Sequence, residues 1–228
     1  MNDKDKEYMK GIFRGPLLKF RETLLMMASL TDRNFTVAMN ALLERDTDKA
    51  QLVESEDAVI DKLEVDLDDM VVKHLSMRGA AASDCRFMLG ASKISEALEN
   101  IADQSVSIAR RVQKLNDLPE VLLDLEIPIM ARTVLRMMRE GIDALVDVDP
   151  DRVPEIVKMD KDIDLMNSDH EEMLNQHMRE HPENVSQCIH YILISRSLER
   201  VGDYAKYIAQ EVYYLYTAKD IRHVTVFD

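Results

Sequence analysis

Two acidic side chains, Glu199 and Asp203, lie four residues apart in the stretch SLERVGDYAKYIAQEV (residues 197–212). Residues at this spacing share one face of a helix, where like charges repel and give the helix no support. Carboxylate oxygens one turn apart are ligands for hard or borderline cations, which neutralise that repulsion. The pair is therefore a candidate metal site, although a single pair of this kind is also common on any solvated helix face.

The same spacing recurs in three further acidic pairs, so that each half of the chain carries two. The eight residues are Asp57, Asp61, Glu99 and Asp103 in the first half and Asp160, Asp164, Glu199 and Asp203 in the second. The second-half residues follow their first-half counterparts by 103 positions for one set of pairs and by 100 for the other. Two offsets this close at separate sites indicate an internal duplication. A repeated arrangement is harder to explain as a solvated face than one pair.

Gly202 stands between Glu199 and Asp203, although glycine weakens a helix interior. Its counterpart in the first half is Ala102, another small residue. We expect both positions to allow a neighbouring helix to approach the acidic patch closely. Simple tolerance of a small residue in packing is the alternative.

The elements that must position these pairs are helices. The chain of 228 residues has six glycines, six prolines and no tryptophan, which leaves little turn or strand chemistry. Capping and breaking residues, including the NDLP stretch at 116–119, divide it into six helical segments. We predict these at about 16–45, 46–77, 83–115, 125–148, 149–181 and 183–218. The predicted fold is all-α, with two tandem three-helix bundles at residues 1–117 and 118–228 related by internal duplication.

Apolar residues in the third and sixth segments alternate steps of three and four, as in a coiled-coil seam. The seam residues are Phe87, Ala91, Ile94, Leu98, Ile101, Ser105, Ile108, Val112 and Leu115, and then Tyr191, Ile194, Leu198, Val201, Ala205, Ile208, Val212 and Leu215. In this register Glu99, Asp103, Glu199 and Asp203 face away from the core. In the second and fifth segments the four aspartates flank the core on its outer side, because the seams there are marked by Ile60, Leu63 and Leu67 and by Ile163, Met166 and His170.

Composition excludes several classes of function. A net charge of −14 opposes a nucleic-acid partner, because phosphate backbones are bound by clustered lysine and arginine. The amino terminus is too charged for a signal peptide, and no apolar run approaches the roughly 18 residues of a membrane span. Cys85 and Cys188 lack the spacing of a zinc site or a disulfide framework. We expect a cytoplasmic protein that meets membranes only through partners.

No catalytic constellation is visible, and we predict that the protein is not an enzyme. No serine or cysteine has an assignable base, and there is no glycine-rich phosphate loop. A ferritin-like di-iron centre would need a glutamate three residues before a histidine, and none of the six histidines has one. His74, His170 and His177 lie on or near apolar seams, where an interior, hydrogen-bonded histidine is expected rather than a ligand. A metal-dependent enzyme of the carboxylate-cluster type stays an alternative.

The stretch LERVGDYAKYIAQEV (198–212) resembles the signature of the PhoU family of bacterial phosphate-signalling regulators, whose repeats carry E(D)xxxD motifs. The resemblance covers both halves, the helix order and the ending KDIRH (219–223). The first half reads LENIAD, with Asn100 and Ala102 where the family usually has arginine and glycine. Gln104 and Tyr204 stand where a histidine is frequent.

This resemblance implies a negative regulator of the phosphate-starvation (Pho) response and of phosphate uptake, coupling a phosphate ABC transporter to a sensor histidine kinase. It also implies multinuclear iron or zinc, or other divalent cations, bound on the bundle surface by the eight E(D)xxxD carboxylates. Arg200 becomes a partner-binding residue, and we expect a homodimer. A regulator of a low-affinity phosphate permease is the alternative within the same family.

Overall fold

The computed structural model describes residues 16–76, 82–121 and 123–222, and these form six long helices and two short 3₁₀ turns. The elements are α2 (Pro16–Glu44), α3 (Thr47–Leu75), α4 (Ala82–Asn116), α5 (Ile127–Asp147), η1 (Pro150–Arg152), α6 (Val153–Glu180), η2 (Pro182–Asn184) and α7 (Val185–Thr217). The described residues contain no strand, and each predicted helical segment corresponds to one helix. The predicted helix end at Met77 and the last residue of KDIRH, His223, lie outside the described residues.

Local chemistry explains where the helices begin and end. The Asp46 side chain accepts a hydrogen bond from the Lys49 backbone nitrogen at 3.0 Å and so caps α3. α5 and α6 each carry a proline in the first turn, where a missing N–H costs nothing. Val148 and Ala218 adopt left-handed backbone conformations that end α5 and α7. The segments predicted to open α6 and α7 are instead the two 3₁₀ turns, so both helices begin a few residues later than predicted.

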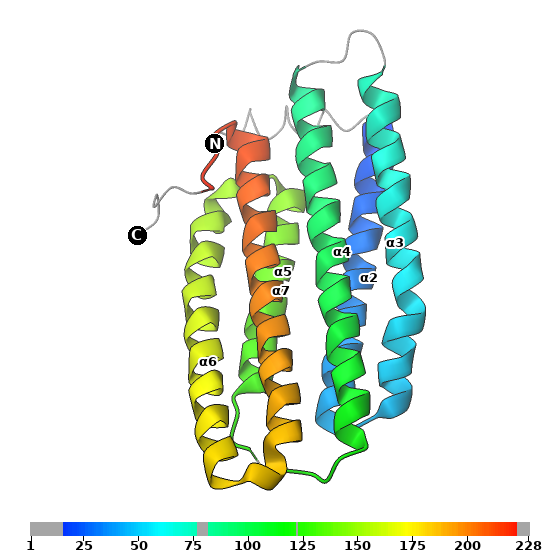
Figure 1. Cartoon of the computed structure of the whole chain (residues 1–228). Helices are drawn as coiled ribbons and strands as arrows, with labels where there is room; N and C mark the ends of the chain where they lie inside the picture. The colour runs from blue at the N-terminus through cyan, green and yellow to red at the C-terminus, as the bar shows by residue number, and fades with distance from the viewer. Residues whose placement is uncertain (1–15, 77–81, 122, 223–228) are drawn as a thin grey trace.

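The six helices form two three-helix groups that stand side by side, α2–α4 and α5–α7 (Figure 1). α4 and α7, which carry the Glu-and-Asp motifs, lie next to each other at the centre and make the most extensive helix–helix contact in the molecule. The boundary predicted between residues 117 and 118 lies in the connection from α4 to α5. The two equivalent motif helices of the duplicated halves, α4 and α7, therefore pack against each other along their length.

The predicted seams form the centre of the core. All nine seam residues of α4 are buried, as are seven of the eight in α7, where only Tyr191 at the start is half-buried. At the crossing of α4 and α7, a Cβ on Gly90 would lie 2.5 Å from Leu215 Cδ2, so glycine is what lets this leucine reach the α4 backbone. One continuous apolar core consequently spans both groups of helices.

Gly202 also lies at a close packing contact between helices. A Cβ at this position would lie 3.2 Å from Ile163 Cγ2 on α6 and 3.5 Å from Val134 Cγ1 on α5. Ala102, the first-half counterpart, is fully buried as well. The expected close approach of a neighbouring helix is therefore observed at Gly202, next to the acidic patch.

Buried polar groups interrupt the apolar interior, and one of them is a histidine. His170 is 2% exposed, and its Nδ1 lies 2.9 Å from Ser195 Oγ, which also contacts Asn167 Oδ1 at 2.9 Å. This confirms the predicted interior histidine at His170, and burial lowers its pKa. The prediction is wrong for His74, which is half-buried and whose two ring nitrogens have no hydrogen-bond partner among the described residues, and His177 is also only half-buried.

At the junction of the two helix groups the carboxylate of Glu211, only 1% exposed, receives Lys93 Nζ at 3.3 Å and Arg222 Nη1 at 3.0 Å. Arg222 also binds the side chain of Asp220, and Ile221 between them is buried. The segment that follows α7 is thereby fixed over this junction.

Candidate functional site

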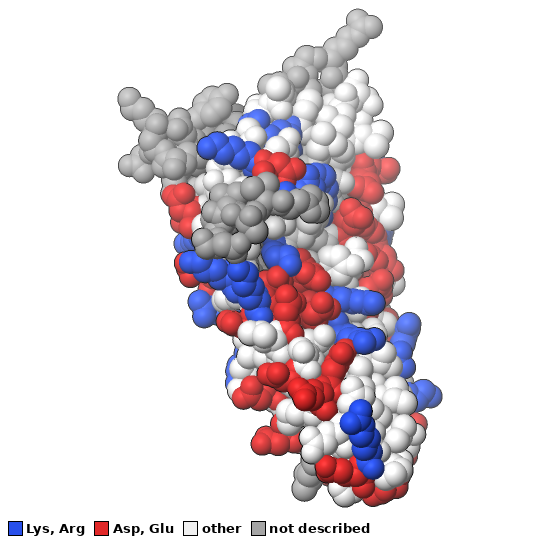
Figure 2. All heavy atoms as spheres, turned by 60° about the vertical axis from the view of Figure 1, so that its left-hand side comes forward, with Lys and Arg blue, Asp and Glu red and all other residues white. Residues whose placement is uncertain are grey.

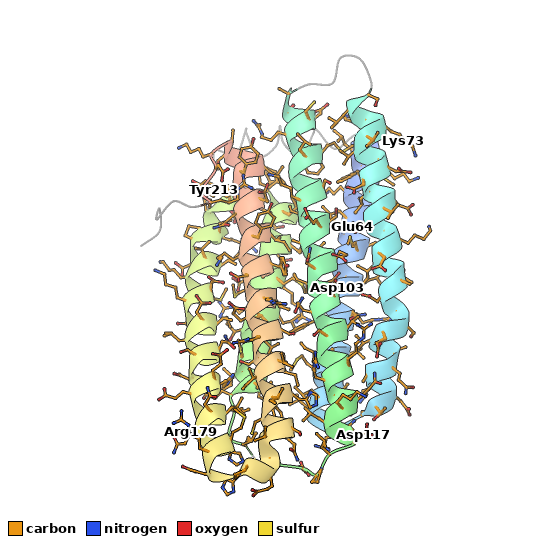
Figure 3. The ribbon with its side chains drawn as sticks, viewed as in Figure 1. Glu64, Lys73, Asp103, Asp117, Arg179 and Tyr213 are labelled. Carbon is orange, nitrogen blue, oxygen red and sulfur yellow. The ribbon has the colours of Figure 1, made fainter. Side chains whose placement is uncertain are left out.

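The first acidic face consists of Asp57 and Asp61 on α3 and Glu99 and Asp103 on α4. These carboxylates lie close enough to influence one another's ionisation, so the structure brings together two pairs that are far apart in sequence. Figure 3 shows Asp103 in the middle part of α4 and Glu64 higher up on the adjacent α3. Asp61 and Asp103 are exposed, whereas Asp57 and Glu99 are half-buried where the helices meet.

The electrostatics of this face disfavour four negative charges. Burial, reinforced by the charges of Asp61 and Asp103, raises the pKa of Asp57 to about 6. Burial and the charges of Asp103 and Glu64 raise the pKa of Glu99 to about 7. An added positive charge would relieve this repulsion.

No positive side chain supplies that charge within the first acidic face. None of its four carboxylates makes an ion pair or hydrogen bond with another described residue, and Asp57 Oδ1 is buried without a hydrogen-bond partner. Arg110 acts on Asp57 only at longer range and pairs instead with Glu54 at 3.1 Å. The face therefore presents oxygen donors, one of them buried, that have no cation of their own.

Glu64 belongs to the same neighbourhood but was missed by the sequence reasoning. Burial and the surrounding carboxylates raise its pKa, with Asp68 the strongest of these charges. Glu64 follows Asp61 by three residues, the other spacing that places side chains on one helix face, so a search at three as well as four residues would have found it.

The second acidic face consists of Asp160 and Asp164 on α6 and Glu199 and Asp203 on α7. Asp160 is only 6% exposed, so its predicted position on the outer side of the helix is wrong. Asp160 lies three residues before Ile163, which packs against Gly202 of α7, and it binds Lys206 of α7, so it belongs to the α6–α7 contact. Asp164 and Asp203 are exposed and Glu199 is half-buried, as on the first face.

Unlike the first face, the second contains its own cation. Lys206 Nζ donates to Asp160 Oδ2 at 2.5 Å and to Asp203 Oδ1 at 2.8 Å, joining α6 to α7. Burial raises the pKa of Asp160, and the hydrogen bond from Lys206 opposes that rise. Burial disfavours the charge on Lys206, but its two carboxylate partners together raise its pKa. The two faces are thus alike in their acids and different in their charge balance.

The donor chemistry of the two faces bears differently on metal binding. Across the described residues, no three histidine, cysteine, aspartate or glutamate side chains converge, as placed, around a position for one metal ion. Metal binding by the eight predicted ligands therefore stays a prediction. The first face fits an oxygen-preferring cation in its donors and in the orphaned Asp57 oxygen, whereas on the second face Lys206 already holds Asp160 and Asp203.

Arg200 projects from α7 beside Glu199. It is exposed and makes no ion pair with any residue that the structure describes, and its charge lowers the pKa of Glu199 against the larger effect of burial. This is the situation of a side chain available to a partner, and its role in partner binding stays a prediction.

The repeated organisation has a direct counterpart among known proteins. Residues 24–112 and 127–212 each match the family model of the PhoU domain. The chain belongs to the PhoU family. The two matches coincide with the two helix groups, and each contains one acidic face, so the predicted all-α tandem repeat and the family resemblance are both confirmed.

Relatives extend this similarity over almost the whole chain. The chain is 33% identical to a phosphate-specific transport system accessory protein PhoU homologue of Pseudomonas aeruginosa, covering 93% of this chain and 88% of the relative. It is 31% identical to the Zymomonas mobilis homologue of the same name, covering 88% and 85%. The crystal structure of PhoU from P. aeruginosa superposes with a TM-score of 0.88 at 33% identity, covering 91% of this chain and 100% of that one.

A more distant neighbour supports the fold alone. The crystal structure of the phosphate transport system regulatory protein PhoU from Streptococcus pneumoniae has a TM-score of 0.78 at 22% identity, covering 89% of this chain and 95% of that one. The Pseudomonas aeruginosa and Zymomonas mobilis relatives are named as accessory proteins and not as enzymes, in agreement with the prediction of a protein without catalytic activity.

The remaining surface shows how the net charge is distributed. On the face in Figure 2 acidic side chains gather in several groups, and lysine and arginine side chains adjoin them. None of the described helices combines the length and apolar composition that a membrane crossing requires. This face thus presents discrete acidic groups bordered by positive charge.

Proposed function

We propose that this PhoU-family protein acts in the cytoplasm as a negative regulator of phosphate uptake and of the phosphate-starvation response. It couples the phosphate ABC transporter to a sensor histidine kinase and restrains the kinase when phosphate is plentiful. The observation that carries this proposal is the match of both repeats, over most of the chain, to proteins named as accessory to phosphate-specific transport. Its homodimeric state belongs to the same proposal.

The first acidic face supplies the physical basis of regulation in this proposal. Its four unpaired carboxylates form an electrostatic docking surface for a basic region of the transporter or kinase. Divalent iron or zinc, held by Asp57, Asp61, Glu99 and Asp103, would neutralise the repulsion within the face and so set how negative the docking surface is. Arg200 contacts the partner from the second repeat.

A reporter strain tests the regulatory function. In a bacterium that lacks its own PhoU and carries a phosphate-repressed reporter, the wild-type chain is expected to restore repression at high phosphate. The variant Asp57→Asn/Glu99→Gln should lose most of that repression. Asp151→Asn/Glu172→Gln removes the same two charges from exposed positions outside both faces and should repress like wild type. Failure of the wild-type chain to repress would refute the function, and equal repression by both variants would refute the role of the face.

A binding assay tests the electrostatic mechanism on purified proteins. Affinity of the chain for the cytoplasmic domain of the kinase should fall at least severalfold between 50 and 300 mM salt, because screening shortens the reach of exposed charges. Comparison of Asp57→Asn/Glu99→Gln with Asp151→Asn/Glu172→Gln separates the effect of the first acidic face on affinity from the effect of overall net charge. Affinity that does not change with salt would contradict docking through carboxylates.

The low-affinity permease is tested in a strain without the ABC transporter. There, the chain is expected to leave phosphate uptake unchanged. Altered uptake through the permease, together with an unaffected kinase reporter, would replace the proposed partner.

A further inference from the structure

The two repeats differ at two positions that affect the charge balance of their acidic faces. Arg200, which stands where the first repeat has Asn100, acts on Glu199 without an ion pair, whereas Lys206 binds two of the acids directly. Lys206 corresponds to Val106 in the first repeat, at the offset of 100 that relates Glu99 to Glu199 and Asp103 to Asp203. Val106 is buried at 5% exposure and carries no charge. The acids are therefore duplicated, and the cation among them is not.

Lys206 binds two of the four predicted metal ligands of the second acidic face. Its ammonium group lies 2.5 Å from Asp160 Oδ2 and 2.8 Å from Asp203 Oδ1, so it takes oxygens from one predicted ligand on each helix. A divalent cation at these oxygens would stand within a few ångströms of a positive charge and repel it. Asp160 is 6% exposed, and burial favours its neutral form, which the hydrogen bond from Lys206 opposes.

We infer that Lys206 is the permanent cation of the second acidic face, so that a divalent cation binds this protein at the first acidic face alone. The inference rests on the proposed function only for cation binding at the first face. The second repeat is then a fixed ion-pair contact between α6 and α7, and the first is the repeat that responds to cations.

Counting bound Mn²⁺ tests this inference directly. Mn²⁺ suits carboxylate ligands, and the loss of its free-ion electron paramagnetic resonance signal reports the number bound. The wild-type chain should show a class of sites that disappears in Asp57→Asn/Glu99→Gln and persists in Asp164→Asn/Glu199→Gln. Loss of Mn²⁺ from wild-type protein on the second substitution would overturn the inference, because the second face would then hold the ion with Lys206 in place.

Substitution of the lysine supplies the reciprocal experiment. Lys206→Val installs the first-repeat residue and should add a second class of Mn²⁺ sites, which a further Glu199→Gln substitution should weaken at least tenfold. Lys206→Arg keeps the positive charge and should bind Mn²⁺ like wild type. Absence of the second class in folded Lys206→Val protein would overturn the inference.

The outcomes separate this inference from the proposed function. If wild-type protein binds no Mn²⁺ and Lys206→Val binds it, Lys206 is confirmed as the excluding group while cation binding at the first face fails. If wild-type protein binds Mn²⁺ at both faces, the inference fails while a metal-bearing regulator stands. The wild-type comparisons do not need the lysine variant, so they decide the matter even if Lys206→Val does not fold.

Discussion

Removal of both cations from buried Glu211 is expected to destabilise the protein strongly. Lys93 Nζ and Arg222 Nη1 lie 3.3 and 3.0 Å from its carboxylate, which is 1% exposed. At an effective dielectric constant of about 20, each attraction amounts to roughly 5 kcal/mol before desolvation is counted. Most of this offsets the cost of burying the charge, and a buried charge left without a partner costs about 3–5 kcal/mol. The variant Lys93→Met/Arg222→Met should lose that much free energy of unfolding.

Urea unfolding followed by circular dichroism measures the loss, and the slope with denaturant should stay unchanged. In thermal unfolding the same loss corresponds to a decrease in Tm of roughly 6–20 °C for a chain of this size. Each single substitution should cost less than half of the double substitution, because the other cation still neutralises the carboxylate. The cost should persist at 1 M salt, since a buried charge is poorly screened.

Two further variants determine whether the unpaired charge of Glu211 causes the loss of stability. Adding Glu211→Gln to the double variant removes the unpaired charge and should recover more than half of the lost stability. Arg196→Met breaks a surface pair in which Arg196 Nε lies 2.8 Å from Glu171 Oε1, and it should cost less than about 1 kcal/mol. No recovery with Glu211→Gln, or a loss in the double variant no larger than in Arg196→Met, would refute the reasoning.

Three other predictions follow from the packing and protonation described above. Because burial lowers the pKa of His170, the unfolded chain binds a proton at this histidine more readily than the folded chain, and the histidine should reduce stability as pH falls below about 6.5. In urea unfolding between pH 7.5 and 5.5, His170→Gln should remove that part of the loss of stability, and an unchanged loss would assign it to other groups. Gly202→Leu should lower the free energy of unfolding by about 1–3 kcal/mol, because the leucine side chain would meet Ile163. Gly202→Ala should change it by less than about 1 kcal/mol. Equal losses of stability in thermal unfolding of the two variants would contradict a steric cause. Arg45 donates hydrogen bonds to the carbonyl oxygens of Leu115 and Leu118 where α4 ends, and its φ is 52°. Arg45→Ala should therefore lower the free energy of unfolding by about 1–2 kcal/mol, and Arg45→Gly by about 0.5–1 kcal/mol less than that, both measured by urea unfolding. An alanine variant more stable than the glycine variant would contradict the backbone argument.

The helices and their core could be predicted from sequence because their signals are local and repeated. A seam that alternates three and four residues specifies which side of a helix is buried, whatever that helix packs against. Asp46 and the first-turn prolines specify boundaries through hydrogen bonds made within a few residues. The 3₁₀ turn at 150–152 was predicted as α-helix, because a proline that suits a first α-helical turn suits a 3₁₀ turn equally well. Residues 183 and 184 of the second 3₁₀ turn were also predicted as α-helix.

The acidic faces could be predicted only in part. The spacing of four and the two repeat offsets were enough to place each set of four carboxylates together. The degree of burial was not predictable, because it depends on how closely two helices approach, and the consequence of Gly202 for Asp160 appears only when α6 is in place. Lys206 could have been noticed as the residue three after Asp203, but its bond to Asp160 crosses between helices.

The difference between the faces follows from two substitutions that act together. Where the first repeat has Ala102 the second has Gly202, and where the first has Val106 the second has Lys206. The glycine admits Ile163 and thereby buries Asp160 against α7, which makes a neighbouring positive charge necessary. The lysine, four residues further along the helix and thus on the same side, supplies that charge. Exchanging only Lys206 for valine therefore leaves a buried, unpaired Asp160. The combined variant Gly202→Ala/Lys206→Val should recover part of the stability that the single change loses, because it gives the second repeat the residues of the first at both positions. If the combined variant is no more stable than Lys206→Val alone in urea unfolding, the glycine and the lysine are independent, and the coupling argued here is wrong.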